Sequence, residues 1–162
     1  MAITGSCLCG GVRFEIERAS GPSEICHCVR CQKKSGATAL EMIAVEAKHY
    51  RLLAGAELIQ CYEAPILNTP PAYTAYFCGR CGSPVPDGST STELVEIPAG
   101  LFDDDPQVRP DKHIFVDFMP AWNVIRDSLP QFDFRQLIKH RFGRDLPSNY
   151  NAKDHQGRTR EP

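Results

Sequence analysis

The stretch that decides the fold of this chain is Cys78-Gly79-Arg80-Cys81-Gly82, a pair of thiols followed by a glycine. A second pair, Cys7-Leu8-Cys9, is followed by Gly10-Gly11 in the same manner. Zinc–sulfur bonds are about 2.3 Å long, and tight turns of this kind bring two thiolates to tetrahedral spacing. Glycine supplies the positive φ or the close backbone approach that such a turn needs. The four cysteines Cys7, Cys9, Cys78 and Cys81 therefore predict a closed structural zinc site, rather than a set of buried reduced thiols.

A third thiol cluster lies between these pairs, in Cys26-His27-Cys28-Val29-Arg30-Cys31. Three thiolates on one zinc ion leave the fourth coordination position open, and an open position can bind a substrate. The following Gln32-Lys33-Lys34-Ser35-Gly36 supplies an amide, two cations, a hydroxyl group and a glycine, which could hold a bound anion. Because zinc lowers the pKa of a coordinating thiol, a small thiol substrate would be activated there. We therefore expect two zinc ions per chain, the second a labile ion held by Cys26, Cys28 and Cys31.

The alternative is a second closed site with a fourth protein ligand. Cys61 is the eighth cysteine, but it stands alone within a predicted strand, where a free cysteine usually acts as a small hydrophobe. His27 lies between two ligands, and strand alternation points its side chain away from them. We expect for His27 a supporting position behind the ligands or a place on the surface.

Length and composition narrow the class of protein. The 162 residues fit one domain, and 18 Lys+Arg against 20 Asp+Glu leave no basic excess that would indicate nucleic-acid binding. The N-terminal residues lack the basic and apolar regions of a signal peptide, and the apolar runs are too short to span a membrane. Eight cysteines without a secretion signal favour metal ligands over disulfides, hence a cytoplasmic protein.

The hydrophobic pattern predicts a mainly β domain over residues 1–146 with one C-terminal helix. Alternating or apolar runs bounded by turn residues predict strands at 12–16, 38–45, 57–62, 72–77, 94–97 and 113–118. Proline-rich stretches, including Pro70 and Pro71, predict loops between them. Asp133 can cap the helix and Gly143 can end it. Residues 147–162 are polar and predict a flexible tail.

The cysteine motifs, together with Ala121-Trp122 and Asp127-Ser128-Leu129-Pro130, resemble the glutathione-dependent formaldehyde-activating enzyme family, which includes centromere protein V-like proteins. The resemblance covers roughly residues 5 to 135. It implies an Mss4-like fold of small antiparallel sheets around zinc. It also implies that Cys7, Cys9, Cys78 and Cys81 bind the structural zinc, and that Cys26, Cys28 and Cys31 bind the catalytic zinc. The activity implied is carbon–sulfur lyase chemistry, the condensation of formaldehyde with glutathione to S-hydroxymethylglutathione.

Two functions remain open at this point. In the first, the thiolate of glutathione or a similar thiol adds to a small carbonyl, and Lys33 or Gln32 stabilises the developing alkoxide. In the second, the chain is a zinc-binding module that holds thiol adducts or contacts a protein partner without turnover. An exposed apolar patch around Trp122 would favour the second function, although we expect Trp122 in the core or in a pocket wall. A third reading, nucleic-acid binding, is disfavoured by the balanced charge.

Overall fold

Strand β3 (Ser23–Cys26) carries the chain from one compact unit into another. The computed structural model describes residues 2–64, 73–88 and 92–148. The first unit comprises Met1–Glu24, Glu41–Glu63 and Thr74–Asp111, and the second Ile25–Leu40, Ala64–Tyr73 and Lys112–Pro162, so far as these ranges are described. Each thiol cluster lies within a single unit, the four-cysteine set in the first and the three-cysteine set in the second.

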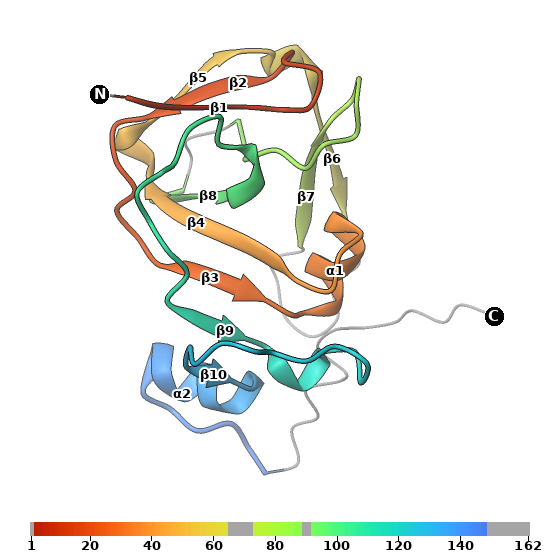
Figure 1. The fold of residues 1–162 in the computed structure, drawn as a ribbon, viewed down its shortest axis with the longest axis vertical. Helices are drawn as coiled ribbons and strands as arrows, with labels where there is room; N and C mark the ends of the chain where they lie inside the picture. The colour runs from red at the N-terminus through yellow and green to blue at the C-terminus, as the bar shows by residue number, and fades with distance from the viewer. Residues whose placement is uncertain (1, 65–72, 89–91, 149–162) are drawn as a thin grey trace, which may run out of the picture. The chain divides into compact units, whose positions relative to one another are not determined.

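The first unit is built from short antiparallel strands. β1 (Ile3–Ser6), β2 (Arg13–Ile16) and β5 (Tyr50–Ala54) form a sheet with β2 in the middle, as Figure 1 shows. A register shift interrupts the β2–β5 pairing between Arg13 and Phe14. β4 (Leu40–Glu46) pairs with β8 (Leu94–Pro98), and β6 (Ile59–Glu63) pairs with β7 (Thr74–Cys78). Short 3₁₀ turns join these strands at Ala47–His49 (η1), Ala56–Leu58 (η2) and Ala99–Leu101 (η3).

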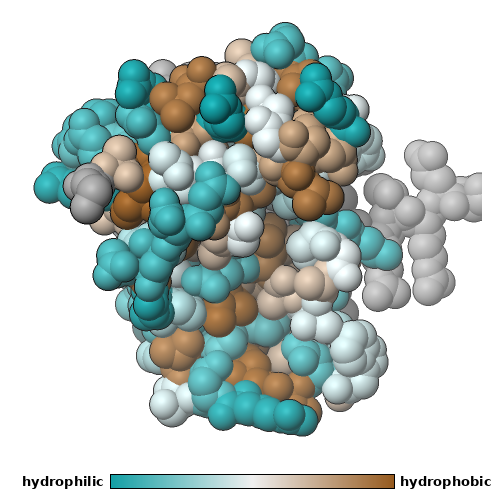
Figure 2. Space-filling model, turned by 45° about the horizontal axis from the view of Figure 1, so that its top comes forward, coloured by the Kyte–Doolittle hydropathy of each residue, from teal (hydrophilic) through white to brown (hydrophobic). Residues whose placement is uncertain are grey.

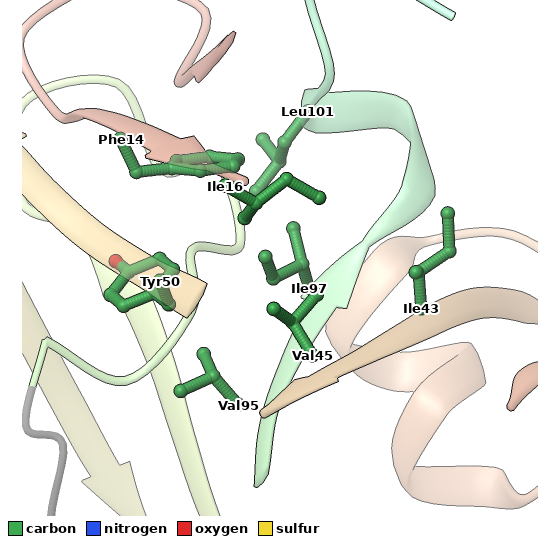
Figure 3. Packing of buried hydrophobic residues seen from close by; sticks show 8 residues of the cluster. All are labelled: Phe14, Ile16, Ile43, Val45, Tyr50, Val95, Ile97 and Leu101. Carbon is green, nitrogen blue, oxygen red and sulfur yellow. The ribbon is translucent and has the colours of Figure 1, made fainter. Parts of the chain in front are cut away.

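The core of this unit is made by the inward-facing residues of four strands and one turn. Alternate residues of β2 are buried, because successive side chains of a strand point to opposite faces. In Figure 3 these side chains converge on residues from β4, β5, β8 and η3. The cluster consists of Phe14, Ile16, Ile43, Val45, Tyr50, Val95, Ile97 and Leu101.

Tyr50 brings the one polar atom into this cluster. Its hydroxyl group is buried and has no hydrogen-bond partner among the described residues. Burial, and to a smaller extent the negative charge of Asp87, raises the pKa of the phenol to about 12. Because the folded protein favours the neutral phenol over the ionised one, the stability of the fold decreases as the pH rises from 10 through 12.

Replacing Tyr50 with phenylalanine is expected to increase the free energy of unfolding at pH 7 by about 1 kcal/mol, because an unpaired buried hydroxyl group is removed. The advantage of Tyr50→Phe is expected to grow between pH 10 and 12, where only the wild-type side chain ionises. Urea unfolding of both proteins at pH 7 and pH 11 measures the difference. A less stable Tyr50→Phe variant at both pH values would show that the hydroxyl group has a partner.

The second unit contains both α-helices. α1 (Val29–Ser35) follows β3, and α2 (Phe134–Phe142) follows a parallel pair of short strands, β9 (Lys112–Ile114) and β10 (Gln131–Phe132). A 3₁₀ turn, η4 (Val116–Phe118), lies between these strands in sequence. The buried cluster of this unit contains the three cysteines with Ile114 and Leu137.

Local sequence signals explain where α2 begins and ends. At the N-terminal end, the Asp133 side chain accepts from the backbone N–H of Gln136, and the Gln136 side chain accepts from the backbone N–H of Asp133. At the C-terminal end, Gly143 adopts the left-handed backbone conformation. Phe134 and Leu137 face inward, and Figure 1 shows the helix beside β10.

The mainly β prediction with small sheets and a C-terminal helix is confirmed, with four corrections. α1 was not predicted. The predicted strand at 113–118 ends at Ile114 and gives way to η4, and the strand predicted from Glu57 begins at Ile59, after η2. β1, β3, β5 and β10 were missed.

The predicted loop at Pro70 and Pro71, and all but two residues of the predicted tail at 147–162, lie outside the described residues. Within the described ranges, no helix is long and apolar enough to cross a bilayer.

Candidate metal centres

The first unit brings Cys7, Cys9, Cys78 and Cys81 together, with all four sulfur atoms within 4.8 Å of one another. The Cys7 and Cys9 sulfurs are 3.5 Å apart, and the Cys9 and Cys78 sulfurs are 3.9 Å apart. These spacings suit four thiolates around one tetrahedral zinc ion. One pair lies between β1 and β2 and the other at the end of β7, so a shared ion would cross-link the two sheets.

Two turns that end in glycine present these cysteines, a four-residue turn from Cys7 to Gly10 and a five-residue turn from Cys78 to Gly82. In each, the glycine N–H bonds the carbonyl of the first cysteine, from Gly10 to Cys7 and from Gly82 to Cys78, both at 2.8 Å. Both glycines have positive φ, +68° at Gly10 and +76° at Gly82, which other residues rarely adopt. The predicted glycine-dependent turns are therefore present at both cysteine pairs.

Hydrogen bonds to sulfur prepare this cluster for a cation. The Val12 N–H donates to the Cys7 sulfur at 3.3 Å. Hydrogen bonds from the Ser83 side chain and backbone lower the pKa of Cys81 to about 5. At least one thiolate is therefore present at neutral pH, and the donor set fits zinc.

The second unit brings Cys26, Cys28 and Cys31 together, also with their sulfur atoms within 4.8 Å of one another. Cys26 ends β3, Cys28 is the N-cap of α1, and Cys31 lies in the first turn of that helix. The Cys28 sulfur accepts from the Cys31 backbone N–H at 3.3 Å, as an N-cap side chain does. All three side chains are buried against Ile114 and Leu137. A strand end and a helix start, joined by His27 alone, thus set the geometry of the cluster.

Electrostatics in this cluster favour a bound cation. The neighbouring thiols, Cys26 first and then Cys31, stabilise a thiolate on Cys28 and lower its pKa to about 3. The same contact with Cys28 raises the pKa of Cys26. For Cys31, the contact with Cys26 favours the thiolate, but Cys28 and burial outweigh it and raise the pKa. Three sulfurs so close cannot all ionise unless a positive ion joins them, and a divalent metal with soft-ligand preference fits this requirement.

No fourth protein ligand joins this cluster within the described residues. Neither Cys61 nor His27 has a ligand atom within reach of all three sulfurs. Cys61 is exposed on β6, in the other unit, and pairs across the strands with Tyr76. The three thiols alone therefore offer an incomplete coordination sphere.

His27 belongs to a chain of hydrogen bonds that the sequence did not reveal. Its Nε2 lies 2.9 Å from Nδ1 of His113, and Nε2 of His113 lies 3.1 Å from both carboxylate oxygens of Asp127. The two histidines are only 2% and 4% exposed, so His27 is not a surface residue. Burial, followed by the neighbouring His113, lowers the pKa of His27. A separation of 86 residues between the histidines leaves no sequence signal for this contact.

Gln32 braces the cluster through its amide group. Its Nε2 donates to the His27 carbonyl at 2.6 Å and to the Phe118 carbonyl at 3.0 Å, so both N–H bonds are used. Phe118 reaches this position because the chain turns at Phe115, which has a φ of +58°, rare for an aromatic residue.

The cations of α1 differ in their relation to the thiols. Lys34 lies three residues after Cys31, on the same helix face, and its charge favours the Cys31 thiolate. Lys33 is exposed on a different face. The Arg30 guanidinium lies 5.1 Å from the centre of the Tyr73 ring.

Trp122 is 77% exposed, so the expectation that it lies in the core was wrong. Val124 nearby is 65% exposed. Across the face drawn in Figure 2, hydrophobic and hydrophilic residues are interspersed.

Comparison with known proteins provides independent information on these clusters. The sequence model of the glutathione-dependent formaldehyde-activating enzyme family matches residues 2–117, which include all seven clustered cysteines. A Halomonas elongata protein, assigned provisionally by its name to the same enzymes, is 29% identical over 125 residues, covering 75% of this chain and 80% of that protein. A solved structure of a Rhodobacter sphaeroides protein is similar with a TM-score of 0.49 and 19% identity, covering 79% of this chain and 98% of the other.

Proposed function

Since this chain belongs to the glutathione-dependent formaldehyde-activating enzyme family, we propose that it is a zinc-dependent carbon–sulfur lyase. Its substrates would be glutathione, or a similar small thiol, and formaldehyde or another small carbonyl compound. In the forward direction the thiol sulfur bonds to the carbonyl carbon, the C=O double bond opens to an alkoxide, and the proton lost by the thiol neutralises that oxygen. The reverse direction cleaves the same carbon–sulfur bond.

The observation that carries this proposal is the incomplete three-thiol cluster. Cys26, Cys28 and Cys31 would hold one zinc ion, and a second would be held by the closed set in the other unit. A zinc ion with three protein ligands acts as a Lewis acid that lowers the pKa of a fourth, incoming thiol. A closed four-ligand site has no place for such a thiol.

The chain's own residues have separate tasks in this proposal. The N-cap position of α1 orients the Cys28 sulfur, and Lys34 adds a positive charge beside the thiolates. Gln32 has both amide N–H bonds engaged with carbonyls, so its part is to hold the His27 and Phe118 backbone. Lys33 is exposed on a different helix face from the thiols, and its role in stabilising the alkoxide oxygen stays a prediction.

The expected result is faster exchange between free glutathione and its formaldehyde adduct. With zinc-loaded protein the rate should exceed the uncatalysed rate at least tenfold, which corresponds to about 1.4 kcal/mol of barrier lowering. Exchange NMR on an equilibrium mixture measures this rate directly and separates it from the spontaneous reaction. Cys61→Ser is the control, because this exposed thiol belongs to neither cluster. A rate equal to that of the protein-free mixture would exclude the lyase activity for these substrates.

A second candidate function is that of a zinc-containing binding module without turnover. The exposed Trp122 favours it, since a large aromatic side chain in solvent is a common anchor for a protein partner. Binding of the thiol adduct to the zinc-loaded protein without acceleration of exchange would support this function over the first.

We further propose a reducing, cytoplasmic compartment. All eight cysteines are free thiols in the structure, and the chemistry of both clusters requires them in that state.

A further inference from the structure

Two buried histidines, His27 and His113, contact each other in the second unit, and His113 also contacts a carboxylate that faces solvent. His27 and His113 lie 2.9 Å apart, and the Asp127 side chain, 48% exposed, is the only accessible member of the chain among these three residues. We propose that Asp127 and His113 are positioning residues, which set the proton position on the His27 ring and thereby hold Cys26 and Cys28 in place for metal binding.

The direction of the hydrogen bonds follows from Asp127. A carboxylate only accepts, so Nε2 of His113 must carry a proton to contact both of its oxygens at 3.1 Å. In the neutral ring, Nδ1 of His113 is then bare and accepts from Nε2–H of His27. The Nδ1 atom of His27 is left without a proton, in agreement with its lack of a hydrogen bond among the described atoms.

This arrangement depends on Asp127, because its carboxylate is the group that fixes which nitrogen of His113 carries the proton. A second contact fixes the carboxylate itself, since its Oδ1 accepts from the Leu129 N–H at 3.0 Å. The exposed residue therefore determines the tautomer of a ring that solvent does not reach.

The His27 ring matters for metal binding because of where it stands in the chain. It is the single residue between Cys26 and Cys28, and its backbone is already held at both ends. Its N–H donates to the Ile114 carbonyl at 3.0 Å and its carbonyl accepts from Gln32. The contact with His113 fixes the remaining freedom of the residue, rotation of the ring. Outer partners of this kind are worth about 10–100-fold in affinity where the histidine itself binds the metal.

The test uses Asp127→Ala in the zinc-loaded full chain. Both carboxylate oxygens lie 3.1 Å from Nε2 of His113, so alanine removes every acceptor that Asp127 offers to this nitrogen. The side chain that fixes the proton on Nε2 of His113 is then absent. We expect long-range proton–nitrogen NMR to show Nε2–H on His27 in the wild-type protein and loss of that signature in the variant. Zinc affinity of the three-thiol cluster, measured by chelator competition, should fall about tenfold.

Two further variants make the result specific. Asp127→Glu keeps the carboxylate and is expected to restore the tautomer and most of the affinity. Asp145→Ala removes the same charge from an exposed residue of the same unit, which pairs with Lys139, and should change neither readout. An unchanged His27 spectrum in Asp127→Ala, or unchanged zinc affinity, would overturn the proposal.

The proposal rests on metal binding by the three thiols, which is part of the proposed function, but not on turnover. If the protein does not accelerate the exchange reaction, the proposal for Asp127 and His113 is unaffected. A wild-type chain that binds no metal at this cluster would refute the proposed function, and would remove the affinity argument for Asp127 with it.

Discussion

Replacing Cys78 with serine is expected to remove the structural metal ion and to destabilise the first unit by about 4 kcal/mol or more, in the range reserved for loss of a metal or a disulfide. Cys78 is fully buried and packs with Cys7, Val12 and Val85. The serine would leave three thiols around an incomplete site and a hydroxyl group in an apolar setting. For a chain of this length, the midpoint of thermal unfolding should fall by roughly 10 °C.

The matched control for this variant is Cys61→Ser. Cys61 lies on β6, the partner strand of β7, and undergoes the same chemical change outside both clusters. Its zinc content and unfolding midpoint should match those of the wild-type protein. If Cys78→Ser kept its full zinc content, the four-thiol cluster would not be a metal site.

Replacing Cys28 with serine is also expected to remove a metal ion, but with little loss of stability. Serine is a preferred N-cap residue, so α1 keeps the hydrogen bond that the Cys28 sulfur now accepts from Cys31. The hydroxyl group is a poor zinc ligand, and two thiols remain. Zinc affinity at this cluster should fall by more than about 100-fold, since even outer partners are worth about 10–100-fold. The catalysed exchange should disappear.

Metal analysis and circular dichroism distinguish the two variants. Cys28→Ser should retain the zinc of the four-thiol cluster and a near-native unfolding midpoint. Cys78→Ser should lose the zinc of that cluster and unfold at a lower temperature. Catalysed exchange at the wild-type rate in Cys28→Ser protein with only one zinc ion per chain would contradict the proposed role of the open cluster.

Features encoded by neighbouring residues were predictable from the sequence. The capped helix from Asp133 to Gly143 is one example, because its start and stop signals lie within the helix itself. The two glycine-ended cysteine turns are another, since their geometry depends on four or five consecutive residues. The alternating pattern of Arg13–Ile16 predicted β2 for the same reason.

Features that depend on distant contacts were not predictable. α1 has only seven residues and a cysteine as its N-cap, which is outside the usual set of capping residues. The strand predicted through Phe118 stops early because Phe115 adopts a positive φ, against the β preference of an aromatic residue. Burial of His27 against His113 requires the folded second unit, and the exposure of Trp122 is likewise decided by packing.

The two clusters also differ in when a growing polypeptide can complete them. All three thiols of the open cluster are present once Cys31 has been synthesised. The four-thiol cluster cannot form until Cys78 has been synthesised, 69 residues after Cys9. At translation rates of about 5–20 residues per second, the interval between Cys31 and Cys78 is roughly 2–10 s. The shorter segment also closes at lower entropic cost. On the ribosome, the nascent chain is thus able to acquire the ion proposed for chemistry before the ion proposed to hold its sheets together.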